Sequence, residues 1–242
     1  MKIISTLIAV FCSLTIFAQV PDNDKIKAEI ENPQSKFFYP NLMARYQLGD
    51  TTLSQDEYHY LYYGYAFSPN YTPLEANELS DSALLVFQKT EPLTETDLHN
   101  LIIYANKELK FDPFSPRTLN LLTYVYGELG DSINERKNYY KMRMVLNTIQ
   151  SSGSGLEENS PKHVLYFTHP NDLLTMLDLQ IVKRTVISRS CEYIQLLKQR
   201  NAPKGLYFDF SRIYWKRPSN ADQKKTKAPM QFNYMKPETK NR

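Results

Sequence analysis

The segment from Ser54 to Tyr65 has the sequence SQDEYHYLYYGY and decides how the N-terminal half of the chain can fold. Ser54 followed three residues later by Glu57 forms a capping box, which marks the start of a helix. Four residues at i, i+3, i+4 and i+7 form the apolar stripe of that helix: Tyr58, Leu61, Tyr62 and Tyr65. This spacing predicts one buried face, so we expect the helix to lie against the core.

Tyr60 and Tyr63 fall outside that stripe. The chain has 18 tyrosines among its 242 residues, and they are densest in this segment. An exposed tyrosine ring can pack on a sugar or a peptide and add a hydrogen bond through its hydroxyl. We therefore predict that Tyr60 and Tyr63 form an aromatic binding surface.

Further helices are predicted at 94–111, 115–130 and 132–149, with a weaker one at 79–87. Thr94 with Asp97, the pair Ser115–Pro116, and Ser132 with Glu135 provide the start signals. The hairpin 115–149 is similar to one tetratricopeptide repeat, because Leu122, Tyr126, Gly130 and Tyr139 have repeat-like offsets. We predict an array of helical hairpins over residues 20–150.

The pattern changes after the sequence SSGSG at 151–155, whose composition predicts a flexible linker over 151–162. Apolar and β-branched runs then predict strands at 163–168, 181–187, 191–198 and 206–214, with a helical turn or two at 171–179. Helices followed by strands predict an α+β fold, with a small antiparallel sheet of 3–4 strands in 163–215 packed on the helices.

Residues 1–19 have the pattern of a secretory signal peptide: Lys2, an apolar run, and a small residue, Ala18, before a polar stretch. We expect a mature chain from about Val20 that is periplasmic or extracellular. A lipid anchor on Cys12 is disfavoured because the bulky Phe11 precedes it. An uncleaved anchor helix is the other alternative.

The charge is unevenly distributed along the chain. Residues 20–211 carry 19 Lys and Arg against 24 Asp and Glu, a net charge of −5, whereas residues 212–242 carry 9 against 2, a net charge of +7. Residues 216–242 also lack apolar periodicity, which predicts a disordered basic tail. The tail could contact anionic lipid at the membrane surface; for an exported protein we expect no nucleic acid partner.

The sequence contains no arrangement typical of catalysis, cofactor binding or metal binding. His59, His99, His163 and His169 form no metal-ligand motif with each other or with Cys191, which is expected to be a buried thiol. No phosphate-binding loop or nucleophile elbow is present. A deep pocket in the fold that holds two of His163, His169 and Asp209, with perturbed pKa values, would support acid–base chemistry.

Three segments together resemble the domain-of-unknown-function family numbered 4919: YQLGD at 46–50, LYYGY at 61–65 and GLYFDFSR at 205–212. The resemblance covers most of residues 36–212. It implies a secreted envelope protein of Gram-negative bacteria and carries no activity or catalytic residue.

These observations favour a secreted, non-catalytic envelope protein that binds a protein or peptide, with no cofactor. An envelope hydrolase and a glycan-binding protein are the alternatives. The partner would be an envelope protein, a peptide or a glycan.

Overall fold

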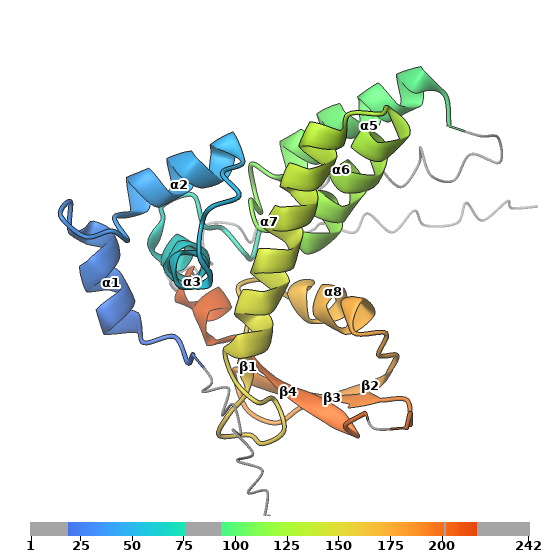
Figure 1. Cartoon of the computed structure of the whole chain (residues 1–242). Helices are drawn as coiled ribbons and strands as arrows, with labels where there is room; N and C mark the ends of the chain where they lie inside the picture. Colours follow the sequence, from blue (N-terminus) through green and yellow to red (C-terminus); the bar gives the residue numbers. More distant parts are fainter. Residues whose placement is uncertain (1–18, 76–92, 201, 217–242) are drawn as a thin grey trace, which may run out of the picture.

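A computed structural model describes residues 19–75, 93–200 and 202–216, in which helices are followed by a small sheet (Figure 1). The helices are α1 (Asn23–Glu31), α2 (Tyr39–Leu48), α3 (Gln55–Gly64), α5 (Glu95–Glu108), α6 (Pro116–Glu128), α7 (Ser132–Ser151) and α8 (His169–Met176), with 3-10 helices η1 (Tyr65–Phe67) and η2 (Ser211–Lys216). The strands are β1 (Lys162–His163), β2 (Ile181–Val186), β3 (Cys191–Leu196) and β4 (Gly205–Asp209). The α+β prediction is confirmed.

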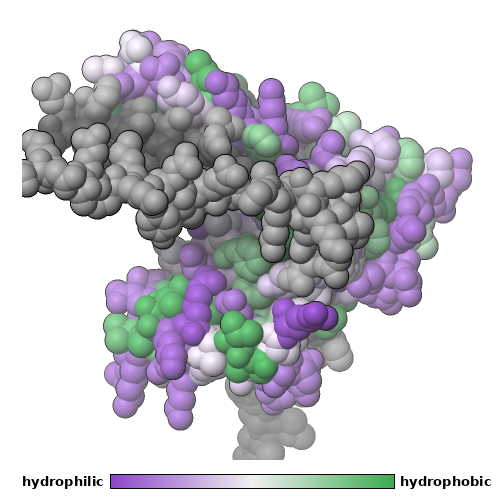
Figure 2. All heavy atoms as spheres, turned by 180° about the vertical axis from the view of Figure 1, so that it is seen from behind, coloured by the Kyte–Doolittle hydropathy of each residue, from purple (hydrophilic) through white to green (hydrophobic). Residues whose placement is uncertain are grey.

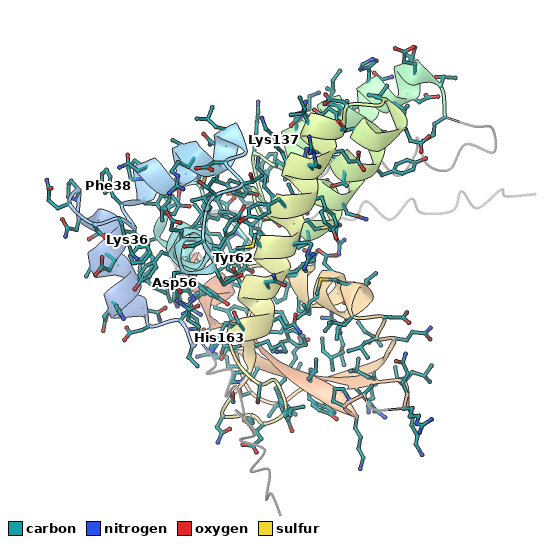
Figure 3. The ribbon with its side chains drawn as sticks, viewed as in Figure 1. Lys36, Phe38, Asp56, Tyr62, Lys137 and His163 are labelled. Carbon is teal, nitrogen blue, oxygen red and sulfur yellow. The ribbon has the colours of Figure 1, made fainter. Side chains whose placement is uncertain are left out.

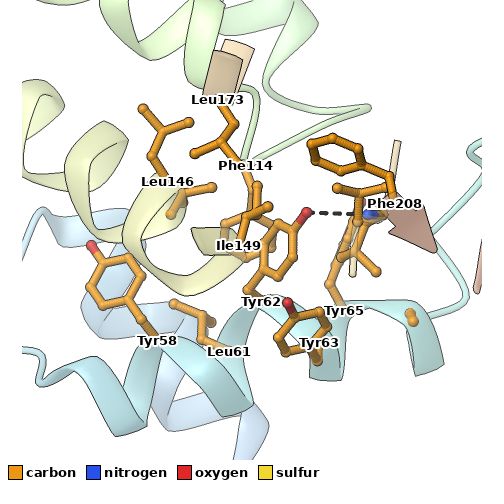
Figure 4. Packing of buried hydrophobic residues seen from close by; sticks show 14 of the residues in the cluster. Tyr58, Leu61, Tyr62, Tyr63, Tyr65, Phe114, Leu146, Ile149, Leu173 and Phe208 are labelled. Atoms are coloured by element: carbon orange, nitrogen blue, oxygen red, sulfur yellow. Dashed lines mark hydrogen bonds between the residues drawn. The ribbon is translucent and has the colours of Figure 1, made fainter. Parts of the chain in front are cut away.

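Helix α3 lies at the centre of the helical part. Its predicted capping box is present, since the Ser54 and Glu57 side chains each accept the other residue's backbone N–H. Helices α1, α2 and α7 all pack against α3, and every residue from Tyr58 to Gly64 is buried. Burial on every side, and not on one stripe alone, makes this short helix the core of the fold (Figure 4).

Local start signals place the downstream helices correctly. The Thr94–Asp97 capping box and the Ser115 cap with Pro116 are both present. The predicted capping box at Ser132 and Glu135 is wrong, because Asp131 caps α7 by accepting the Asn134 backbone N–H. With the cap one residue earlier, the Glu135 N–H that the predicted box would use donates to the Asp131 carbonyl instead.

The sheet has the strand order β1-β4-β3-β2 (Figure 1). The pairs β2–β3 and β3–β4 are antiparallel as predicted, but β1 pairs with β4 in parallel, so the sheet is mixed. The predicted strand 163–168 shrinks to two residues, since the Leu165 N–H donates to the buried Tyr62 hydroxyl and not to a strand. The predicted strand 206–214 ends at Asp209, whose carboxylate accepts the Ser211 N–H where η2 begins.

The segment after α7 is an ordered loop and not the flexible linker expected from its composition. The Gly155 N–H donates to the Ser160 carbonyl, and the Tyr207 N–H donates to the Gly155 carbonyl, which ties the loop to β4. A Cβ at Gly153 would lie 1.9 Å from the Pro161 carbonyl oxygen, so only glycine fits that close approach. One hydrophobic cluster spans both parts of the chain, from Tyr58 in α3 to Phe208 in β4.

Three sequence predictions lie outside the described residues: the signal peptide at 1–19 apart from its last residue, the helix at 79–87 and the basic tail beyond Lys216. Within the part of the chain that is described, no helix combines the length and the apolar character needed to cross a membrane.

The buried tyrosines provide a test of this core. Replacing Tyr62 with Phe removes a hydroxyl that joins His169 and Leu165, and we expect it to lower the free energy of unfolding by about 1–3 kcal/mol. Tyr58→Phe is the matched control, because the Tyr58 hydroxyl is buried without a hydrogen-bond partner among the described residues. Urea unfolding should show Tyr58→Phe equal to or above the wild type. Equal losses for both variants would contradict the assigned role of the Tyr62 hydroxyl.

Candidate functional site

The predicted aromatic surface at Tyr60 and Tyr63 is wrong. Tyr60 is 7% exposed and Tyr63 is fully buried. Tyr60 stacks on Phe37, with ring centroids 3.8 Å apart, and the Tyr63 hydroxyl donates to the His163 carbonyl. The helical stripe identified a buried face correctly, but the neighbours of α3 also cover the side of the helix that carries Tyr60 and Tyr63.

A buried hydrogen-bonded chain joins Tyr62, His169 and Asp112. His169 is fully buried; its Nδ1 lies 2.7 Å from the Tyr62 hydroxyl and its Nε2 lies 2.8 Å from Asp112 Oδ2. Since the Leu165 N–H already donates to the Tyr62 oxygen, all groups are satisfied when Tyr62 donates to Nδ1 and Nε2–H donates to Asp112. The chain of bonds holds the start of α8 against α3; its histidine and tyrosine have no exposed surface (Figure 3 labels Tyr62).

His163 and Asp209 form a second pair, which His169 does not join. Asp209 Oδ1 lies 3.3 Å from His163 Nδ1 and also accepts the Ser211 N–H. Burial disfavours the Asp209 carboxylate, but hydrogen bonds from His163 and Ser211 outweigh it and lower the pKa of Asp209 below its usual value. Arg212 Nη1 lies 3.4 Å from His163 Nδ1, and its Nη2 donates to the Pro21 carbonyl and to Asn23 Oδ1, which joins η2 to the start of α1.

The surroundings of His59, His99 and Cys191 also fit structural or solvated side chains. His59 is buried, not on a polar face, and burial followed by repulsion from Arg212 lowers its pKa to about 4. His99 is exposed beside Glu95, as expected for a solvated side chain. Cys191 is buried as predicted, and burial raises the pKa of its thiol to about 11, which disfavours the reactive thiolate. Across the described ranges, no three His, Cys, Asp or Glu side chains gather to hold a metal ion.

The open surface of the helical part lies along α6. Leu119, Leu122 and Val125 bury one face of this helix. The opposite face carries Arg117, Asn120, Leu121 and Tyr124, and three adjoining hollows of about 220, 550 and 280 Å³ all include Arg117 in their lining. We call this surface the α6 groove.

Arg117 lies at the middle of the α6 groove and is held in place by α8. Its Nη2 lies 2.8 Å from Asp172 Oδ1, and its Nε lies 3.0 Å from the same oxygen. Burial raises the pKa of Asp172, although Arg117 opposes the shift. The Arg117 side chain is still 46% exposed, so its outer surface is available to a ligand.

The two ends of the α6 groove differ in chemistry. At one end, Tyr124 is 48% exposed beside Leu121. At the other end, the hollow contains Glu75, Glu108 and Asp112, and burial raises the pKa of Glu108. The groove therefore runs from an apolar aromatic end to an acidic end.

A separate hollow of about 530 Å³ lies beside the C-terminus of α7 and includes Gln55, Asn147 and Lys162. Lys162 Nζ donates to the carbonyls of Gln150 and Gly153, and burial lowers the pKa of its ammonium to about 8. These bonds satisfy the free carbonyls at the helix end, so Lys162 has a structural role.

The apolar stripe of each helix predicted the buried faces, and no sequence pattern was assigned to the α6 groove. The available signal was a second stripe on this helix, because Arg117, Asn120, Leu121 and Tyr124 have the same helical spacing as a core stripe. It places an arginine and a tyrosine on the face opposite the buried one. Whether that face is covered depends on α8, which is far along the chain.

A family model described as "Domain of unknown function (DUF4919)" matches residues 24–217. The chain has no significant match among curated proteins or among solved structures.

The pair His163–Asp209 predicts a defined pH dependence. Because the folded-state pKa of Asp209 is lowered, its ionised form stabilises the fold above the unfolded-state pKa of about 4, and this contribution is lost as the pH falls through the folded value. We expect Asp209→Asn to cost about 1–2 kcal/mol at pH 7 and much less near pH 2.

Unfolding curves between pH 2 and 7 measure that difference. Glu158→Gln, at an exposed position, is the control and should match the wild type at every pH. A deficit of Asp209→Asn that is constant over this range would contradict the charge-based account.

Proposed function

Because the chain belongs to the DUF4919 family, whose description names no activity, we propose from its geometry that it is a binding module for an extended peptide segment of a partner protein, held in the α6 groove. The observation that carries this proposal is the convergence of three hollows on the exposed, anchored Arg117.

The dimensions of the groove suit a short peptide. Helix α6 has 13 residues, so it is about 20 Å long at about 1.5 Å per residue. An extended peptide rises about 3.3 Å per residue, so about six residues would lie along it. The sequence of the α6–α7 hairpin resembles one tetratricopeptide repeat, and stacked helical repeats present extended surfaces that bind partners.

The chemistry of the groove also favours a peptide. Asn120 has both donor and acceptor atoms, which suit the alternating N–H and C=O groups of an extended backbone. Tyr124 and Leu121 suit an apolar side chain, and the carboxylates at the other end suit a basic one. Arg117 is positioned before binding by Asp172, which reduces the entropy lost when a ligand binds.

The hydrolase alternative has weaker support. It requires His163 and Asp209 to face a substrate, but their polar atoms face each other, Ser211 and Arg212. His169, the third residue considered, is fully buried between Tyr62 and Asp112.

We further propose that the protein acts outside the cytoplasm, because residues 1–19 have the pattern of a signal peptide. The chain expressed in a Gram-negative host should then be recovered from the periplasm without its first 19 residues or so. Mass spectrometry of the N-terminus gives the measurement. Recovery of an intact Met1 in the cytoplasm would remove the export proposal.

Peptide binding predicts a loss at Tyr124. Peptides selected from a random displayed library against the full chain should bind at least about tenfold more weakly to Tyr124→Ala, because about 1.4 kcal/mol of contact is lost. Tyr139→Ala is the matched control, since Tyr139 is 47% exposed on α7 compared with 48% for Tyr124.

Fluorescence polarisation with the selected peptides measures both affinities. Equal affinity for the two variants, or the failure of Arg117→Ala to weaken binding, would place the peptide site away from the α6 groove.

A further inference from the structure

Strand β2 has an open edge and two open faces. It is the last strand in the order β1-β4-β3-β2, so β3 pairs with one edge and, within the described residues, no strand pairs with the other. All six residues of β2 are exposed, including Ile181 at 39%, Val182 at 55% and Val186 at 71%. In an antiparallel pair every second residue directs its N–H and C=O away from its partner, so this edge presents unpaired backbone groups.

β2 combines protective features of an exposed edge with exposed apolar residues. Exposed edges are ordinarily short, bulged, charged or covered, because a long apolar edge pairs with other chains. The register of β2 against β3 shifts between Ile181 and Lys183, so β2 is bulged there and pairs regularly from Lys183 to Val186. Here β-branched apolar residues lie at both ends of the strand and Lys183 and Arg184 lie at its centre. Figure 2 shows the molecule from behind, and over the sheet apolar residues lie between hydrophilic residues on the surface.

The charge around β2 is opposite to that of the rest of the folded chain. Residues 181–204 carry six basic residues and one acidic residue, Glu192, a net charge of +5, whereas residues 20–211 as a whole carry −5. Glu192 lies 3.3 Å from Arg184, which also donates to Asn171 Oδ1, so Lys183 carries the charge on this strand that is available to a partner. The open edge is therefore suited to an anionic partner.

A second copy of the chain is a poor occupant. An antiparallel pairing of two β2 strands centred on the strand would place Lys183 of one copy opposite Arg184 of the other. Like charges directly opposite each other destabilise a strand pair. A flat membrane surface is also a poor fit, because the adjacent Lys183 and Arg184 lie on opposite faces of β2 and one lipid surface would contact only one of them.

We propose that β2 is a docking edge for an extended, acidic segment of a partner protein. The segment adds a fifth strand to the sheet, with carboxylates near Lys183 and Arg184 and apolar side chains near Val182 and Val186. Backbone hydrogen bonds along the edge supply affinity, and the Lys183 side chain selects the partner. This proposal is independent of the α6 groove.

The experiment is hydrogen–deuterium exchange of the full chain with a capped probe peptide, Thr-Val-Thr-Glu-Glu-Thr-Val-Thr. We expect backbone amides of 182–186 to exchange at least about fivefold more slowly in its presence, as pairing protects them. A peptide with Lys-Lys in place of Glu-Glu should give no protection.

Two charge-reversal variants test whether Lys183 contributes to binding of the acidic probe peptide. Lys183→Glu should weaken binding of the acidic probe at least about tenfold, whereas Lys198→Glu, an exposed lysine outside the strands, should change it by less than about threefold. A thermal midpoint equal to that of the wild type shows that each variant is folded.

Three outcomes would overturn the proposal: equal protection by the Lys-Lys peptide, protection of α6 in place of β2, and no protection by either peptide. Binding to vesicles of anionic phosphatidylglycerol that Lys183→Glu abolishes, without any protection by the acidic peptide, would assign the edge to lipid and also overturn it.

Discussion

Hydrogen bonds from buried tyrosine hydroxyls to distant parts of the chain organise this structure. Burying an unpaired hydroxyl costs free energy, so each core tyrosine that has such a partner restricts where a distant part of the chain can lie. The Tyr62 hydroxyl is hydrogen-bonded to His169 Nδ1. The Tyr63 hydroxyl donates to the His163 carbonyl, and the Tyr71 hydroxyl donates to the Leu165 carbonyl. Three tyrosines near α3 thus hold the short segment 163–169 in one position.

The position of that segment determines the surface that we propose for binding. Because His169 is the first residue of α8, the tyrosine contacts also place α8 beside α6. Asp172 on α8 then reaches Arg117 and holds its guanidinium in the groove. A core interaction at Tyr62 is in this way connected, through one helix, to the orientation of an exposed arginine.

The net charge also differs from one segment of the chain to another. The net charge of +3 for the whole chain is the sum of an acidic helical part, a basic stretch around β2 and β3, and a basic C-terminal sequence. The acidic end of the α6 groove and the basic β2 edge therefore favour ligands of opposite sign. Two surfaces of one small fold can select different partners because exposed charges act over only about 8–10 Å at physiological salt.

Local chemistry was sufficient for the helices, since a capping residue and an apolar stripe act within a few residues of each other. The starts of α3, α5 and α6, the α+β class and strands β2 and β3 follow from such signals. The same reasoning misassigned Tyr60 and Tyr63, because a stripe predicts a buried face but does not show whether the other face is also covered. The predicted strand 163–168 was also longer than β1, because the hydrogen bond from the Leu165 N–H to the Tyr62 hydroxyl joins residues 103 positions apart.

The sequence by itself determined where α3, α5 and α6 begin, which class of fold the chain forms and how charge is divided along it, because these depend on neighbouring residues. Only the tertiary structure decided which faces stay open. It encloses α3, exposes Arg117 and Tyr124, and leaves one edge of β2 without a paired strand among the described residues. Exposure is set by what packs from elsewhere in the chain, and that information is absent from any single segment.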